Sequence, residues 1–144
     1  MKSHLIDLER RALQFQKCGQ LKEAIGLFTA IVNEQPDWEH GSAFYNLACS
    51  YEDLGEFALA EQCFGDALKY EPNNPYFLGG LASFLYLHGD PVKAFEAYLN
   101  LLNVERINSN ARGIEASMAA LSALGNKIGM SEEVFLKTTK DGKP

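Results

Sequence analysis

The amino-acid sequence predicts an all-α protein built from stacked helical hairpins. Glycines that would end the first helix of each hairpin recur at intervals of 36, 34 and 36 residues: Gly19, Gly55, Gly89 and Gly125. An alanine and an aromatic position in the second helix repeat at 36 and 34 residues: Ala24, Ala60 and Ala94, then Phe28, Phe64 and Tyr98. A period of this length, carried by three classes of residue, is typical of helical repeat arrays. No segment has a convincing strand pattern.

The first repeat is expected at about residues 5–38. Apolar residues lie at helical spacing in both of its helices: Leu8, Ala12 and Phe15, then Ala24, Ile25, Phe28 and Ile31. Pro36 would end the second helix, and Asp37 would cap the next one. Two extra residues within 38–40 are expected to lengthen the following helix or the turn before it.

The second and third repeats are expected at 41–74 and 75–108. In the third, Asn74 and Asp90 each precede a proline, Pro75 and Pro91. A cap followed by proline marks a helix start. A backbone N–H at the first helical position has no partner within the helix, so proline, which lacks this group, is tolerated there.

A fourth unit is expected to begin and remain incomplete. A capping helix is predicted at about 109–125, capped by Asn108 or Ser109 and ended by Gly125. A short helix is predicted at 131–137, and the polar residues 138–144 are expected to form a flexible tail. Residues 1–137 would then form a single domain.

Residues 41–74 carry a recognisable pattern, Phe-x2-Leu-Ala-x2-Tyr, then Ala-x3-Phe, then proline. Its members are Phe44, Leu47, Ala48, Tyr51, Ala60, Phe64 and Pro72. The pattern resembles the tetratricopeptide repeat (TPR) family. That resemblance implies a right-handed superhelical solenoid of three hairpins plus the capping helix, with an inner wall made by the first helix of each repeat. Size, repeat number and acidity are also similar to bacterial chaperones for type III secretion translocators.

The resemblance places nine candidate partner-binding residues on this inner wall: Tyr45, Asn46, Cys49, Asp53, Tyr76, Gly79, Gly80, Ser83 and Tyr86. Tyrosine rings offer apolar area, and an amide can bridge a partner backbone. Alternatively, Tyr45 and Tyr86 pack only against neighbouring helices. Gly79 and Gly80 would either let a ligand approach the backbone or let two helices pack closely.

Asn46 stands where relatives that bind chaperone C-terminal tails hold the peptide carboxylate. Those relatives also need basic side chains in the first and third repeats. Here the corresponding residues are Glu9, Leu13, Tyr76 and Gly80, so an acidic tail is not the expected ligand.

Composition and motifs exclude several functions. The net charge of −6 and the pI of about 5.0 argue against nucleic acid as a partner. The sequence contains no run of about 18 apolar residues, so insertion into a membrane is not expected. The N-terminus lacks the apolar segment of a signal peptide. An odd number of cysteines without a close pair suggests reduced thiols and a cytoplasmic location.

Catalytic and metal-binding patterns are absent too. The three histidines, His4, His40 and His88, have no metal-type spacing, and no glycine-rich phosphate loop follows a strand. We therefore expect no enzyme activity, no metal and no cofactor.

The sequence best fits a non-catalytic adaptor or small chaperone that binds a peptide segment of a partner protein in a concave groove. The alternative is a structural scaffold that self-associates, for example as a homodimer, or assembles in a larger complex through its terminal helices. Its basis is a set of small residues in the capping helix: Ala111, Ala116, Ala119, Ala120 and Ala123. Packing of this helix onto the third repeat would explain those alanines equally well.

Overall fold

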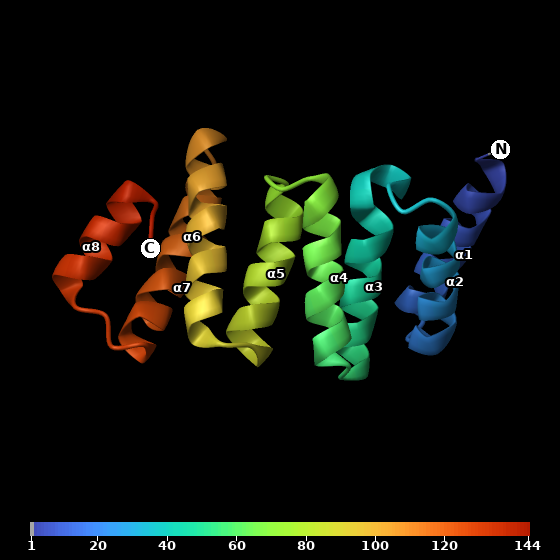
Figure 1. The fold of residues 1–144 in the computed structure, drawn as a ribbon, viewed down its shortest axis with the longest axis horizontal. Helices are drawn as coiled ribbons and strands as arrows, with labels where there is room; N and C mark the ends of the chain where they lie inside the picture. The colour runs from blue at the N-terminus through green and yellow to red at the C-terminus, as the bar shows by residue number, and fades with distance from the viewer. Residues whose placement is uncertain (1) are drawn as a thin grey trace. The chain divides into compact units, whose positions relative to one another are not determined.

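The computed structural model describes residues 2–144, so residue 1, with which the expected domain begins, lies outside the described residues. The chain forms two compact units, the first ending at Pro72 and the second beginning at Asn73. The described residues form α-helices and one 3-10 turn, η1, coloured in chain order in Figure 1. Their bounds are α1 Ser3–Lys17, α2 Leu21–Glu34, η1 Trp38–Gly41, α3 Ser42–Leu54, α4 Phe57–Tyr70, α5 Pro75–His88, α6 Pro91–Ile107, α7 Ala111–Lys127 and α8 Glu132–Asp141.

The first unit contains two helical hairpins, α1–α2 and α3–α4, and α2 packs against α3. The repeated alanine and aromatic positions form its core: Ala12, Ala24, Phe28, Ala48, Ala60 and Phe64 are at most 1% exposed. The turn glycines Gly19 and Gly55 adopt positive φ, 76° and 84°, as expected for residues that end a helix. The 34- to 36-residue period therefore reflects the packing of these hairpins.

The connection between the two hairpins has the longer turn before α3 that was one of the two expectations, but not the expected cap. Asp37 makes no capping hydrogen bond. Instead, Trp38 is buried, 2% exposed, and the three residues after it, Glu39, His40 and Gly41, all have positive φ. The two extra residues thus form a tight left-handed turn before α3, and burial of the indole decides the path of the chain.

The second unit begins with the hairpin α5–α6, and here the predicted caps are confirmed. The side-chain oxygen of Asn74 accepts hydrogen bonds from the backbone N–H groups of the second and third residues after it, at 2.9 and 3.2 Å. Asp90 does the same at 2.8 and 3.1 Å. Both prolines occupy the start of their helices, as predicted.

Helix α7 packs along α6, as a capping helix should, but its ends were wrongly predicted. Asn110, rather than Asn108 or Ser109, provides the cap by accepting from the N–H of the third residue after it. Gly125 does not end the helix, because it is buried within α7. A Cβ atom at this position would lie 3.1 Å from the ring of Phe135, so the glycine permits close approach of α8.

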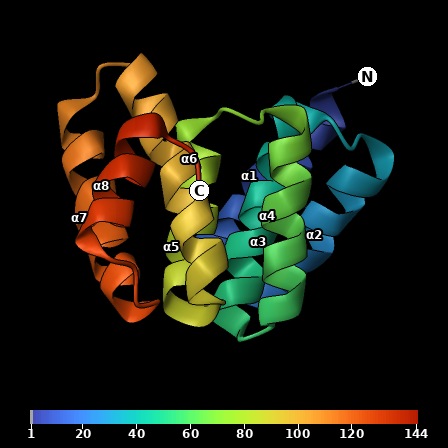
Figure 2. The ribbon, with the colours of Figure 1, turned by 60° about the vertical axis from the view of Figure 1, so that its left-hand side comes forward.

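Helix α8 corrects the prediction of a flexible tail at 138–144. Thr138 and Thr139 are buried, and the Thr139 hydroxyl donates to the carbonyl of Phe135 at 2.9 Å. From α6, the Arg106 guanidinium donates to the carbonyl of Thr139, and the Asn103 amide donates to that of Gly142. Figure 2 shows α8 (red) beside α6 and α7. These contacts hold the C-terminal segment to the second unit although its sequence is polar.

Candidate functional site

In the first unit, helix α3 carries four of the candidate residues. Tyr45, Cys49 and Asp53 are spaced by four residues and so share one face, with Asn46 beside them. Tyr45 is half-buried, and its ring meets Phe64 of α4 edge to face, with centroids 5.6 Å apart. Asp53 is exposed. Tyr45 therefore has the packing role considered above, whereas Asp53 is open to a partner.

The thiol of Cys49 lies on the same face and is not activated as a nucleophile. Burial raises the pKa of Cys49 to about 11, helped by the negative charges of Glu52 and Asp53, while a hydrogen bond with Tyr45 acts in the opposite direction. Burial likewise raises the pKa of Cys63 to about 11. Since the thiolate is the nucleophile, both residues are inert thiols near neutral pH.

The backbone of Asn46 belongs to a polar cluster that the sequence analysis missed. The Gln16 amide on α1 donates to the Asn46 carbonyl at 3.1 Å and to the Ser50 hydroxyl at 2.9 Å. Ser50 is fully buried and donates to the same carbonyl at 2.9 Å. A serine four residues after Asn46, in an otherwise apolar interface, was the only available signal. The cluster fixes α1 on α3 and leaves the Asn46 side-chain amide without a hydrogen bond among residues 2–144.

In the second unit, helix α5 carries the other five candidates. Tyr76, then Gly79 and its neighbour Gly80, then Ser83 and Tyr86 follow one another at intervals of three or four residues, so they form a continuous helical face. Tyr76 is 68% exposed and Tyr86 42% exposed. Ser83 is exposed as well, and the two glycines are half-buried. This face offers more open aromatic surface than that of α3.

Tyr98 of α6 joins this face and was not recognised as a candidate. Its ring packs perpendicular to that of Tyr86, with centroids 6.2 Å apart. Ser83 forms a side-chain hydrogen bond with Tyr98, whose pKa is raised mainly by burial. The signal was present in the repeat pattern, because Tyr98 is the only one of the three equivalent aromatics, with Phe28 and Phe64, that carries a hydroxyl.

Gly79 takes the repeat position that Tyr45 holds in the second repeat. It stands 34 residues after Tyr45, as Tyr98 stands 34 residues after Phe64. In the second repeat Tyr45 covers Phe64, which is 1% exposed, whereas Tyr98 is only half-buried. A Cβ atom at Gly79 would meet only the Cδ2 atom of Leu101, at 4.0 Å. Within its unit, Gly79 therefore has open space around it rather than a tightly packed neighbour, and it carries no side chain that could cover Tyr98 as Tyr45 covers Phe64.

Two further kinds of site were searched for in residues 2–144. No group of three or more His, Cys, Asp or Glu side chains could hold a metal ion there. In the same part of the chain, every helix is too short or too polar to cross a membrane.

Comparison with known proteins relates this geometry to a family. Residues 45–111 match the family model described as "Tetratricopeptide repeat". A chloroplastic protein from Arabidopsis thaliana is 29% identical over 110 residues. This match includes 71% of the chain but only 30% of that relative, so the chain spans less than a third of the relative's length.

Solved structures share the fold at low sequence identity. The type III secretion chaperone SycD of Yersinia enterocolitica, in complex with a peptide of the translocator YopD, has a TM-score of 0.76 at 18% identity, over 88% of this chain and 96% of that one. The first TPR domain of Spaghetti (RPAP3), bound to the HSP90 peptide SRMEEVD, has a TM-score of 0.74 at 18% identity, over 90% and 96%. A further SycD structure is described as an alternative dimer.

The predicted likeness to TPR proteins, including type III secretion translocator chaperones, is confirmed by these matches. The chain is an all-α protein with the tetratricopeptide repeat fold.

Proposed function

We propose that this protein is a non-catalytic adaptor or small chaperone that binds a peptide segment of a partner protein through the first helices of its repeats. The observation that carries the proposal is the face of α5, where exposed Tyr76 and Tyr86 flank the open space at Gly79. SycD and RPAP3, which share the fold, are described in complex with peptides.

The chemistry of the two faces suggests what the peptide contains. The open space at Gly79, on the same helical face as Tyr76 and Tyr86, suits an apolar or aromatic anchor, since ring pairs favour edge-to-face contact. The Asn46 side-chain amide, which makes no hydrogen bond within residues 2–144, suits a partner backbone. Exposed Asp53 favours a basic rather than an acidic segment. An acidic tail such as SRMEEVD is not the proposed ligand, because the basic clamp positions hold Glu9 and Gly80 among others.

Absence of catalysis is part of the proposal. Cys49 on α3 and Cys63 on α4 have pKa values raised to about 11, so neither is an activated nucleophile. The net charge of −6 favours a protein partner over nucleic acid. Free Cys18, Cys49 and Cys63 fit a reducing compartment, for which we propose the cytoplasm.

A second candidate function is assembly with a second copy through α7. Four of its alanines are exposed: Ala111, Ala116, Ala119 and Ala123. The residues that α7 buries are different ones, Ser117, Leu121, Leu124 and Gly125, so packing onto the third repeat does not explain the exposed alanines. Light scattering distinguishes the two functions, because assembly through α7 predicts a dimer that Ala119→Arg converts to a monomer.

The main proposal is tested by affinity capture from a lysate of the source organism. Tyr76→Ala is chosen because the ring is 68% exposed, so its loss should not unfold the protein; Tyr45 is avoided because it packs on Phe64. Ile107→Ala is the matched control, since this residue is 82% exposed at the end of α6. Partners recovered with wild type and the Ile107 variant, but lost with the Tyr76 variant, support the proposal. Equal recovery in all three would refute it.

A further inference from the structure

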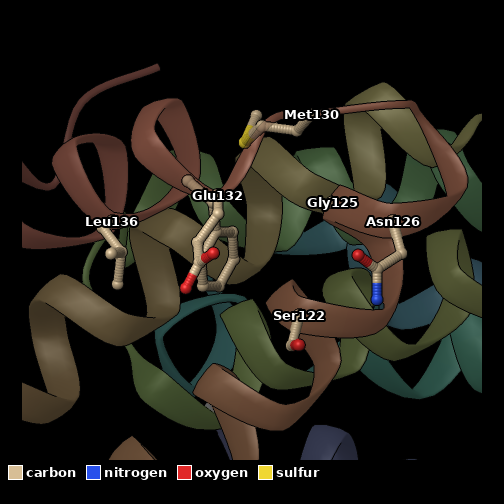
Figure 3. A pocket seen from close by; sticks show the side chains of 7 residues that line it. Ser122, Gly125, Asn126, Met130, Glu132 and Leu136 are labelled. Carbon is tan, nitrogen blue, oxygen red and sulfur yellow. The ribbon is translucent and has the colours of Figure 1, made fainter.

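A cavity of about 350 Å³ opens between α7 and α8 in the second unit, away from the α5 face. Figure 3 shows its lining from close by. Two helices and the loop between them supply the lining residues, which are Ser122, Gly125, Asn126, Met130, Glu132, Phe135 and Leu136. Its size lies in the range of pockets that bind ligands.

The apolar wall of the cavity is held in place by specific contacts. Gly125 allows the Phe135 ring to approach α7, and that ring also packs edge to face on Phe95 of α6, with centroids 6.5 Å apart. The backbone N–H of Met130 donates to the carbonyl of Gly125 at 2.8 Å, which fixes the loop. The cavity is therefore a consequence of packing and would persist without a ligand.

Three polar side chains face the cavity without a partner of their own. Ser122 and Asn126 come from α7 and Glu132 from α8, and Figure 3 shows them around the same opening. None of these side chains makes a hydrogen bond or ion pair within the described residues 2–144. Each provides an acceptor oxygen, and Glu132 also carries a negative charge. No lysine or arginine is among the lining residues, so no basic side chain of the lining pairs with Glu132.

We propose that this cavity binds an arginine side chain presented by a segment of a partner protein. A guanidinium group has five N–H donors in a planar fork, which suits three separate acceptors better than the compact ammonium of lysine. The Phe135 ring offers a cation–π contact, and Met130 and Leu136 offer apolar contact to the aliphatic stem.

A partner segment is favoured over free arginine by the surface around the opening. Leu136 lines the cavity and is 57% exposed, so it can contact an apolar residue next to the arginine. The site is separate from the α5 face, and its test does not depend on the function proposed above.

The test uses the full chain with 13C-labelled methionine methyl groups and the peptide acetyl-Leu-Arg-Leu-amide. The chain has three methionines, and Met130 is the one that lines the cavity. We expect its methyl signal, assigned through Met130→Leu, to shift saturably while that of Met118 stays in place. The same peptide with citrulline, which keeps the shape but not the charge, should bind about fivefold more weakly. Acetyl-arginine-amide should also bind more weakly, because it lacks the flanking leucines.

A matched pair of variants completes the test. Glu132→Gln should raise the Kd of the arginine peptide about fivefold. Glu133→Gln makes the same change of charge one residue further along α8, outside the cavity lining, and should leave the Kd unchanged. Four results would overturn the proposal: no shift of the Met130 methyl, equal affinity for the citrulline peptide, equal affinity for acetyl-arginine-amide, or equal weakening by both variants.

Discussion

Replacing Gly79 with alanine should stabilise the protein, because this glycine lies inside α5 and has no packing function within its unit. A glycine in a helix interior costs about 0.8–1.0 kcal/mol relative to alanine. The added Cβ atom would meet only the Leu101 side chain, at 4.0 Å, which is ordinary van der Waals contact. That contact adds about 0.1–0.2 kcal/mol. The expected gain in the free energy of unfolding is therefore about 1 kcal/mol.

Urea denaturation followed by circular dichroism measures this gain, and the m-value should stay constant. For a chain of this length, 1 kcal/mol corresponds to a rise in Tm of about 3–5 °C. Gly65→Ala is the matched control, since Gly65 is exposed within α4 and a Cβ atom there would meet nothing within 4 Å. Loss of stability in the Gly79 variant, with a gain in the Gly65 variant, would show that helices do pack closely at Gly79.

Two further predictions concern the thiols and a turn. At pH 8, iodoacetamide should modify exposed Cys18 well before Cys49 and Cys63, as measured by mass spectrometry of the digested protein. Alkylation of Cys49 or Cys63 before Cys18 would contradict this prediction. Because the folded-state pKa of both slow thiols is raised from 9.0 to about 11, their contribution to stability is complete below pH 9 and is lost as the pH rises towards 11. Gly41→Ala should destabilise the protein by about 2 kcal/mol or more, because φ is 95° and the new Cβ atom would lie 2.9 Å from a backbone oxygen of α4. Gly55→Ala is the control, because Gly55 has a similar φ of 84° but a Cβ atom there would meet nothing within 4 Å. A thermal melt in which both variants lose the same stability would contradict the steric clash expected at Gly41.

The sequence was sufficient for the repeats because their signals are local. Asn74 and Asp90 each stand before a proline, and the structure has both as helix caps. Fixed offsets between small and large apolar residues predicted which faces are buried.

Features that depend on distant contacts could not be predicted in the same way. Gly125 looks like the other turn glycines in the sequence, yet it is buried inside α7 because Phe135 packs against it. Thr138 and Thr139 are polar, so nothing local indicates that α6 holds their segment in place. Arg106 donates to the backbone of α8, a contact between residues 33 positions apart that nothing around it in the sequence indicates.

The candidate site was predicted in part by the repeat register. It identified Tyr76 and Tyr86 as surface positions, and both are exposed. It could not show that Tyr45 packs on Phe64, or that Tyr98 forms part of the same face as Tyr86, since both depend on ring orientation between two helices.

The most direct test of peptide binding by the α5 face is photo-crosslinking in the source organism with p-benzoylphenylalanine at position 76 or 107. Both native residues, Tyr76 and Ile107, are highly exposed, at 68% and 82%, so each position accepts the probe without repacking. If the α5 face binds a partner segment, position 76 should crosslink to one defined protein at a single short stretch of its sequence, and position 107 should not. Crosslinking of that protein from position 107 alone, or equally from both positions, would contradict binding by the α5 face.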